Sequence, residues 1–142
     1  MIFWKKFFKK TIKILSIIIA SVLIIIIIYT IIHPISMPNK LVEKYLFLKI
    51  DRGTSMEEAI KEIEDKWEIR RIDYEHGIYY GRNGRSLDFI LEDPEKIVGD
   101  KFIDVCLGEY TIVFECFVYA YFIFDENDKL IQIIVRKDLE AM

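Results

Sequence analysis

Residues 110–124 read YTIVFECFVYAYFIF, and this stretch decides the fold of the chain. Apolar and aromatic side chains recur there at every second position, which is the period of a β-strand. We therefore predict a long strand over residues 110–124 with one face packed on a core. The residues predicted on that core face are Ile112, Phe114, Cys116, Val118, Ala120, Phe122 and Phe124.

Turn-forming residues on both sides of this strand predict antiparallel neighbours. Residues 125–129, DENDK, turn the chain into a return strand over residues 130–136. Residues 108–109, Gly-Glu, are predicted to form the preceding turn. The cross-strand pairs that this turn implies are Ile103 with Phe114 and Val105 with Ile112.

A further hairpin is predicted over residues 78–89. Asn83 and Gly84 are the residue types that a two-residue type I′ turn requires, because both of its central positions have positive φ. Counting outward from that turn pairs Tyr80 with Leu87 and Ile78 with Phe89, all on one face of the hairpin.

Helical signals precede the strands. Thr54 or Ser55 can cap a helix whose first turn carries Glu57 and Glu58, at the end where the helix dipole favours negative charge. The apolar stripe of this helix is Met56, Ile60, Ile63 and Trp67. Residues 41–50 form either a helix or a first strand, and we favour a helix for the first half. The fold class predicted is α+β: one or two helices packed on an antiparallel β-meander.

The N-terminal region predicts a membrane-spanning helix over residues 14–32. These 19 residues carry no charge, and at about 1.5 Å per residue they reach roughly the 30 Å thickness of a bilayer core. The hydroxyls of Ser16, Ser21 and Thr30 can bond back to helix carbonyls. The run is longer than the apolar region of a secretory signal and no Ala-x-Ala cleavage pattern follows, so we expect the helix to be retained.

Charge asymmetry predicts the orientation and the division into segments. Residues 1–13 contain five lysines, so the positive-inside rule places them in the cytoplasm. Residues 33–40 hold two of the three prolines and are predicted to be a linker to one extracytoplasmic domain, residues 41–142. After the span, 15 Lys and Arg stand against 23 Asp and Glu, a net charge of about −8. This balance argues against nucleic acid as a partner.

Catalytic and metal chemistry lack recognisable signals in this sequence. Asp73 and His76 could mimic part of a catalytic set, but no nucleophile motif, phosphate loop or dinucleotide fingerprint is present. The predicted register places Cys106 and Cys116 on opposite faces of the sheet, so we expect free thiols. We expect no enzyme activity, cofactor, metal site or small-molecule substrate.

The non-core face of the long strand is the candidate protein-binding surface. An open two-layer sheet usually presents polar side chains to water, whereas this face carries four large apolar or aromatic groups: Phe117, Tyr119, Tyr121 and Ile123. The alternative is that residues 41–50 or the C-terminal tail cover it. Four arginines are candidate contacts for an anion or acidic partner, or charges that keep a loop soluble: Arg70, Arg71, Arg82 and Arg85.

The segments 50–63 and 122–135 resemble the SmpA/BamE-type envelope module. The first contains Ile50-Asp51-Arg52-Gly53-Thr54-Ser55-Met56-Glu57-Glu58-Ala59-Ile60, similar to that family's Gly-x-Ser/Thr-x-x-Glu helix start; the second contains Phe124-Asp125, a turn and Leu130. The resemblance implies a helix before a small antiparallel sheet, as in β-lactamase-inhibitor-like proteins, and a non-enzymatic accessory role. The chain lacks that family's lipidated cysteine and its Leu-Gly-x-Pro pattern.

Together these features predict a single-pass membrane protein that binds another envelope protein outside the cytoplasm. The alternative is a membrane-tethered immunity or exclusion protein, whose acidic domain would neutralise a basic toxin at the envelope.

Overall fold

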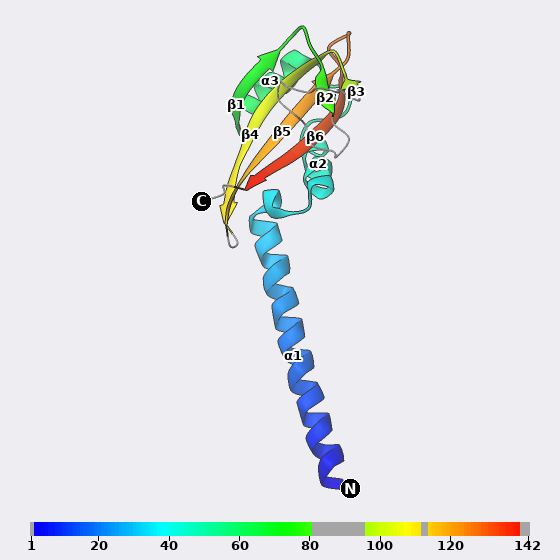
Figure 1. Ribbon diagram of the computed structural model, residues 1–142, viewed down its shortest axis with the longest axis vertical. Coiled ribbons are helices and arrows are strands. Elements are labelled where there is room, and N and C mark those ends of the chain that lie inside the picture. The colour runs from blue at the N-terminus through cyan, green and yellow to red at the C-terminus, as the bar shows by residue number, and fades with distance from the viewer. Residues whose placement is uncertain (1, 81–95, 112–113, 140–142) are drawn as a thin grey trace. The chain divides into compact units, whose positions relative to one another are not determined.

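The computed structural model describes residues 2–80, 96–111 and 114–139. The chain forms two compact units, residues 1–34 and 35–142, and each is considered separately. The first unit is the helix α1 (Ile2–Ile32), shown in blue in Figure 1.

Helix α1 is long and apolar enough to cross a membrane over the 23 residues Lys10–Ile32, none of which is buried. The hydroxyls of Ser16 and Ser21 donate to the carbonyl oxygens four residues earlier, at 3.0 and 2.9 Å, and Thr30 donates to Ile27 at 2.9 Å. These bonds satisfy the polar groups of the apolar run, as the sequence predicts.

The second unit is an α+β domain, and its fold class is the predicted one. Its helical part is a 3₁₀ turn η1 (Pro34–Ser36) followed by α2 (Asn39–Phe47) and α3 (Met56–Glu64). The strands are β1 (Glu68–Asp73), β2 (Ile78–Tyr80), β3 (Lys96–Val98), β4 (Lys101–Thr111), β5 (Glu115–Phe124) and β6 (Leu130–Leu139).

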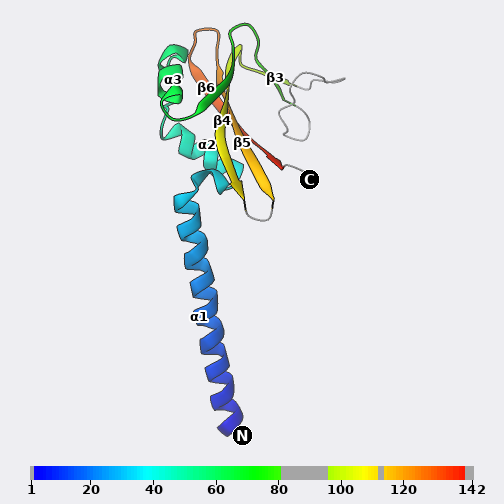
Figure 2. The same cartoon turned by 90° about the vertical axis from the view of Figure 1, so that its left-hand side faces the viewer.

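Four strands form an antiparallel sheet in the order β1-β4-β5-β6, and β2 pairs with β3 in a separate two-stranded sheet. The main sheet is thus a meander into which the β2–β3 hairpin is inserted after its first strand. Figure 2 shows α2 and α3 on one side of the main sheet and β3 on the other.

Local sequence explains where the helices begin. Ser55 caps α3 by accepting the N–H of Glu58, and the Glu58 carboxylate reaches back to the Ser55 N–H, which forms a capping box. Residues 41–47 are helical, as favoured from sequence, within α2. This helix protects an otherwise open sheet edge: Asn39 Nδ2 donates to the carbonyl of Val135 at 3.0 Å, and the Val135 N–H donates to Glu43 at 3.3 Å.

The main core lies between the helices and the sheet. Alternate residues of β5 point into it, and Val118, Ala120, Phe122 and Phe124 are fully buried there, which confirms the predicted core face for these residues. The helical contributions that pack against them are Val42 and Leu46 from α2 and Met56, Ala59 and Ile63 from α3. Ile60 and Trp67 of the predicted stripe are partly buried against the same cluster.

The turn predicted at Gly108 is wrong. Strand β4 continues through Gly108, whose φ of 125° accompanies a register shift between Cys106 and Gly108. Glycine tolerates this backbone conformation, so the residue marks a β-bulge and not a chain reversal. As a consequence Ile103 pairs with Phe122 and Val105 with Ala120. Strand β5 begins at Glu115, and Phe114, predicted in the core, is 54% exposed.

In the described residues, β2 pairs with β3, with Ile78 opposite Val98 and Tyr80 opposite Lys96. The predicted pairs of Ile78 with Phe89 and of Tyr80 with Leu87 involve residues outside the described ranges. The Asn83-Gly84 turn itself, Ile112, Arg82 and Arg85 lie outside the described residues.

Candidate functional site

The face of the main sheet that points away from the helices is here called the outer face, and within the described residues one half of it is covered. A second apolar cluster lies on that half, where Ile78 of β2 packs on side chains from β4, β5 and β6, with Val98 of β3 and Ile131 against it. The sheet residues of this cluster are Phe102, Tyr121, Ile123 and Ile134. The rings of Phe102 and Tyr121 meet edge to face with centroids 6.3 Å apart.

Close backbone approach holds the β2–β3 hairpin against the sheet. Asp100 donates its N–H to the carbonyl of Phe124 at 2.9 Å. Gly99, just before it, has φ of 69°, and a Cβ there would lie 2.3 Å from Cγ2 of Ile123. Only glycine fits this position without displacing a neighbour, because it combines positive φ with no room for a side chain.

This packing divides the candidate binding surface predicted from sequence. Tyr121 is 2% exposed and Ile123 is fully buried, so neither is available to a partner. Phe117 and Tyr119 are half-buried and lie beyond the second cluster. The β2–β3 hairpin covers this part of the face. From the sequence, the alternative to an exposed face was a cover formed by residues 41–50 or the C-terminal tail. Residues 41–47 instead belong to α2, on the core side of the sheet.

A β-bulge in β1 brings two arginines to the outer face together. The register of β1 on β4 shifts between Ile69 and Arg71. As a result the guanidinium of Arg70 lies over the ring of Tyr119, 4.4 Å from its centroid, and that of Arg71 lies 5.4 Å from the ring of Phe102. A regular strand would point consecutive residues to opposite faces, so the bulge is what permits this arrangement.

The other half of the outer face carries four side chains that are exposed or partly exposed, here called the open patch: Arg70, Cys106, Phe117 and Tyr119. Cys106 and Tyr119 are direct cross-strand partners. Arg70 also lies 3.7 Å from the buried carboxylate of Asp104. The sequence singled out Arg70, Phe117 and Tyr119, but it offered no signal for the bulge that brings Arg70 onto Tyr119.

The electrostatics of the open patch centre on Tyr119. Partial burial raises the pKa of its phenol, and the nearby Arg70 guanidinium opposes this increase. At neutral pH the phenol is therefore a neutral hydrogen-bonding group beside a cation. On β6, Arg136 is the cross-strand partner of Tyr119, and Asp138 is the partner of Phe117. Arg136 donates to Asp138 at 2.7 Å, and this pair borders the open patch.

The two cysteines are free thiols on opposite sides of the sheet. Cys116 is 2% exposed and lies on the same side as Val118, whereas Cys106 is half-exposed on the outer face. Within the described residues, no group of three or more His, Cys, Asp or Glu is arranged to hold a metal ion.

Asp73, His76 and Arg71 meet where β1 ends. The Asp73 carboxylate accepts the N–H groups of Glu75 and His76 at 3.0 and 2.9 Å, and Arg71 donates to it at 2.7 Å. Burial alone would raise the pKa of Asp73, but the hydrogen bonds from the N–H groups of Glu75 and His76, together with the His76 ring, lower it. This network fixes the chain between β1 and β2.

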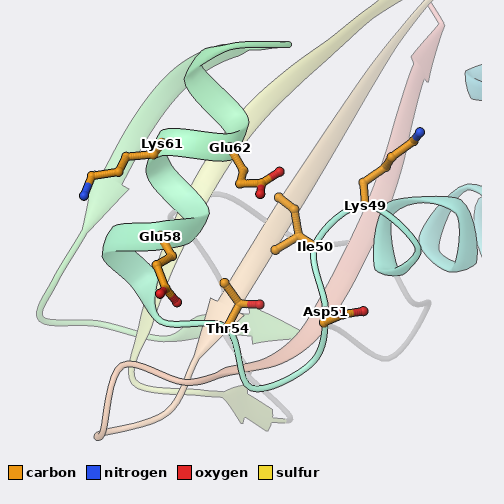
Figure 3. A pocket seen from close by; sticks show the side chains of 7 residues that line it. All are labelled: Lys49, Ile50, Asp51, Thr54, Glu58, Lys61 and Glu62. Carbon is orange, nitrogen blue, oxygen red and sulfur yellow. The ribbon is translucent and has the colours of Figure 1, made fainter.

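A hollow of about 390 Å³ lies between α3 and the loop after α2 (Figure 3). It is lined by Lys49, Ile50, Asp51, Thr54, Glu58, Lys61 and Glu62. In Figure 3 the amino groups of Lys49 and Lys61 point away from the hollow. Glu58 is engaged in the capping box, and its hydrogen bonds with Ser55 lower its pKa. The lining groups therefore do not converge on a common point where a ligand would sit.

A second hollow adjoins Tyr74 and the ion pair of Lys101 with Asp128. Asp73 and His76 line neither of these two hollows. No protein-family model, curated protein or solved structure matches the chain.

Proposed function

We propose that the protein is a non-enzymatic, membrane-anchored module that binds another envelope protein through the open patch. In this proposal residues 14–32 of α1 are retained as a single span, the five lysines among the first 13 residues stay in the cytoplasm, and the α+β domain lies outside. The length and apolar character of α1 support the anchor, and the lysines support the orientation.

The observation that carries the binding role is Arg70 held over Tyr119. Arginine and tyrosine are enriched at the residues that contribute most to protein–protein affinity, mainly because they combine large apolar area with directed hydrogen bonds. The Arg70 guanidinium is placed by two contacts, the Tyr119 ring at 4.4 Å and Asp104 at 3.7 Å. A side chain that is already ordered loses less entropy when a partner binds.

The resemblance to SmpA/BamE-type modules agrees with an accessory role of this kind. A non-enzymatic role also agrees with the engagement of Asp73, which accepts hydrogen bonds from Arg71, Glu75 and His76 within one turn. Such an arrangement orders the backbone between β1 and β2.

Site-specific photo-cross-linking in intact membranes tests the binding surface. A photoreactive amino acid would be placed at Phe117 and, as a matched control, at Tyr74, a ring that is 59% exposed outside the open patch. We expect a discrete cross-linked partner from position 117 and none from position 74. Arg70→Glu should reduce the yield at 117. Equal products at both positions, or a yield indifferent to Arg70→Glu, would contradict the proposal.

The alternative function, neutralisation of a basic toxin, has one supporting observation. The exposed surface of α3 and its C-terminal end is rich in acids: Glu57, Glu58, Glu62, Glu64 and Asp65. Lys61 and Lys66 pair with Glu57 and Glu62, which leaves the surface acidic on balance. Toxin challenge of cells with and without the protein distinguishes this function, because a general binding module should not change survival.

A further inference from the structure

Helix α2 presents apolar side chains on two neighbouring faces, roughly 100° apart around the helix axis. Val42 and Leu46 are fully buried against the sheet. On the neighbouring face, Leu41 is 46% exposed and Leu48, directly after the helix, is 82% exposed. Tyr45 lies between them, half-buried and packed partly against the core. The spacing 41, 45, 48 places these three side chains along one helical stripe. Within the described residues, core packing accounts for the buried face and leaves Leu41 and Leu48 exposed.

The exposed stripe is bordered by cationic side chains in a domain that is otherwise acidic. Lys40 has 84% of its side chain exposed, Lys44 is exposed beside Leu48, and the amine of Lys49 lies 5.6 Å from the Tyr45 ring. The acid of this helix, Glu43, is already engaged with Lys40 and with the N–H of Val135. The exposed side of α2 is therefore basic and apolar together.

Chain connectivity limits how far α2 can lie from the end of α1. Only residues 33–38 separate Ile32 from Asn39, and three of them form the turn η1. Even a fully extended chain of this length covers no more than about 25 Å. If α1 spans a bilayer, the first residue of α2 therefore lies within about 25 Å of the end of the span.

We propose that the stripe Leu41, Tyr45 and Leu48 contacts the lipid surface beside the span, with Lys40 and Lys44 at anionic headgroups. This inference rests on the proposed anchor. Leucine and tyrosine enter the boundary between headgroups and acyl chains, whereas lysine stems lie along apolar surface and keep their amines in water. The attraction of basic residues to anionic lipid falls off within a Debye length, so proximity is essential. The contact would restrict the orientation of the domain on the membrane.

Depth measurements on the full-length protein in lipid vesicles test the contact. A fluorescent amino acid would replace Leu48 or, as a control, the exposed Tyr74. The vesicles would contain anionic phosphatidylglycerol and a lipid with a nitroxide near its headgroup, which quenches nearby fluorophores. We expect stronger quenching at position 48 than at position 74. Equal quenching at the two positions, or none at 48, would overturn the proposal.

Charge reversal separates lipid contact from other causes of quenching. Lys40→Glu with Lys44→Glu should lower quenching at position 48 by roughly twofold or more at low salt. The matched control, Lys61→Glu on α3 with Lys66→Glu just after it, changes the charge equally and should leave quenching at position 48 unchanged. Equal effects of the two pairs would reject a local contact. Quenching at 48 that appears only after a second protein is added would assign the stripe to a protein partner and also overturn the proposal.

Failure of the underlying anchor can be recognised independently. Alkaline carbonate extraction should leave the full-length protein in the membrane if α1 spans it. Release by carbonate would reject the anchor itself, whereas retention with an unquenched position 48 would reject only the lipid contact of α2.

Discussion

The two halves of the outer face of β5 have the same kind of side chains and different environments. Tyr121 and Ile123 lie under the β2–β3 hairpin and are 2% and 0% exposed. Phe117 and Tyr119, on the same face of the same strand, are only half-buried. The alternation along the strand is continuous, so the difference arises from what packs on it.

This comparison shows that an apolar face is not by itself a binding surface. The hairpin that covers one half is inserted between β1 and β4, and it reaches the sheet through the close contact at Gly99. The covered half therefore contributes to stability. The open patch, by contrast, is free to contribute to recognition, so substitutions in the two halves should have different consequences.

The largest expected effect comes from the covered half. Ile123→Ala should lower the free energy of unfolding by about 2–5 kcal/mol, because it removes a fully buried side chain and leaves a cavity. Urea unfolding of the full-length protein in detergent, followed by Trp67 fluorescence, measures it. A loss below about 1 kcal/mol would mean that the hairpin does not exclude water from Ile123.

A somewhat smaller effect is expected where the hairpin approaches the sheet. Gly99→Ala should cost about 1–3 kcal/mol, because the new Cβ would lie 2.3 Å from Ile123 at a residue with φ of 69°. Gly53→Ala is the matched control: its φ of 87° is also positive, but nothing lies within 4 Å of the new Cβ. If both variants lose equal stability, the backbone conformation matters and the contact with Ile123 does not.

The turn that leads into the hairpin should make stability depend on acid pH. The pKa of Asp73 is lowered in the folded protein, so the unfolded chain binds this proton more readily. The stability that the carboxylate contributes is present above its ordinary pKa of 3.8 and is lost as the pH falls through the lower folded value. Asp73→Asn should flatten the decline in stability below about pH 4. A decline as steep as that of the parent protein would contradict this assignment.

The smallest effect on stability is expected in the open patch. Phe117→Ser and Tyr119→Ser should each cost about 1 kcal/mol in unfolding experiments, because these rings are half-buried at the surface. With the photoreactive residue at position 117, Tyr119→Ser should also abolish capture of the cross-linked partner. A loss as large as that of Ile123→Ala would show that the two halves of the face do not differ.

Much of the fold could be predicted because its signals are local. The capping residues Ser55 and Glu58 lie three positions apart, and the core-facing residues of β5 follow a period of two. The turn over residues 125–129 is formed by side chains that bond their own backbone, as when Asp125 accepts the N–H groups of Asn127 and Lys129 at 2.9 Å.

The wrong predictions concern strand pairing, which residues close together in the sequence do not determine. Gly108 is equally suited to a turn or a bulge, since both use positive φ, and the pairing of β4 with β5 over ten positions selected the bulge. The pairing of Ile78 with Val98 has no signal in the local sequence, because the two residues lie far apart in the chain.

The sequence by itself determined the apolar span, the α+β class and the core-facing side of β5, because hydrophobic period and helix caps act over a few residues. The tertiary structure decided the rest. It covered Tyr121 and Ile123 with the hairpin, and through a bulge in β1 it placed Arg70 over Tyr119. Burial depends on residues that are distant in the chain, so no pattern within one strand can show which half of its face stays open.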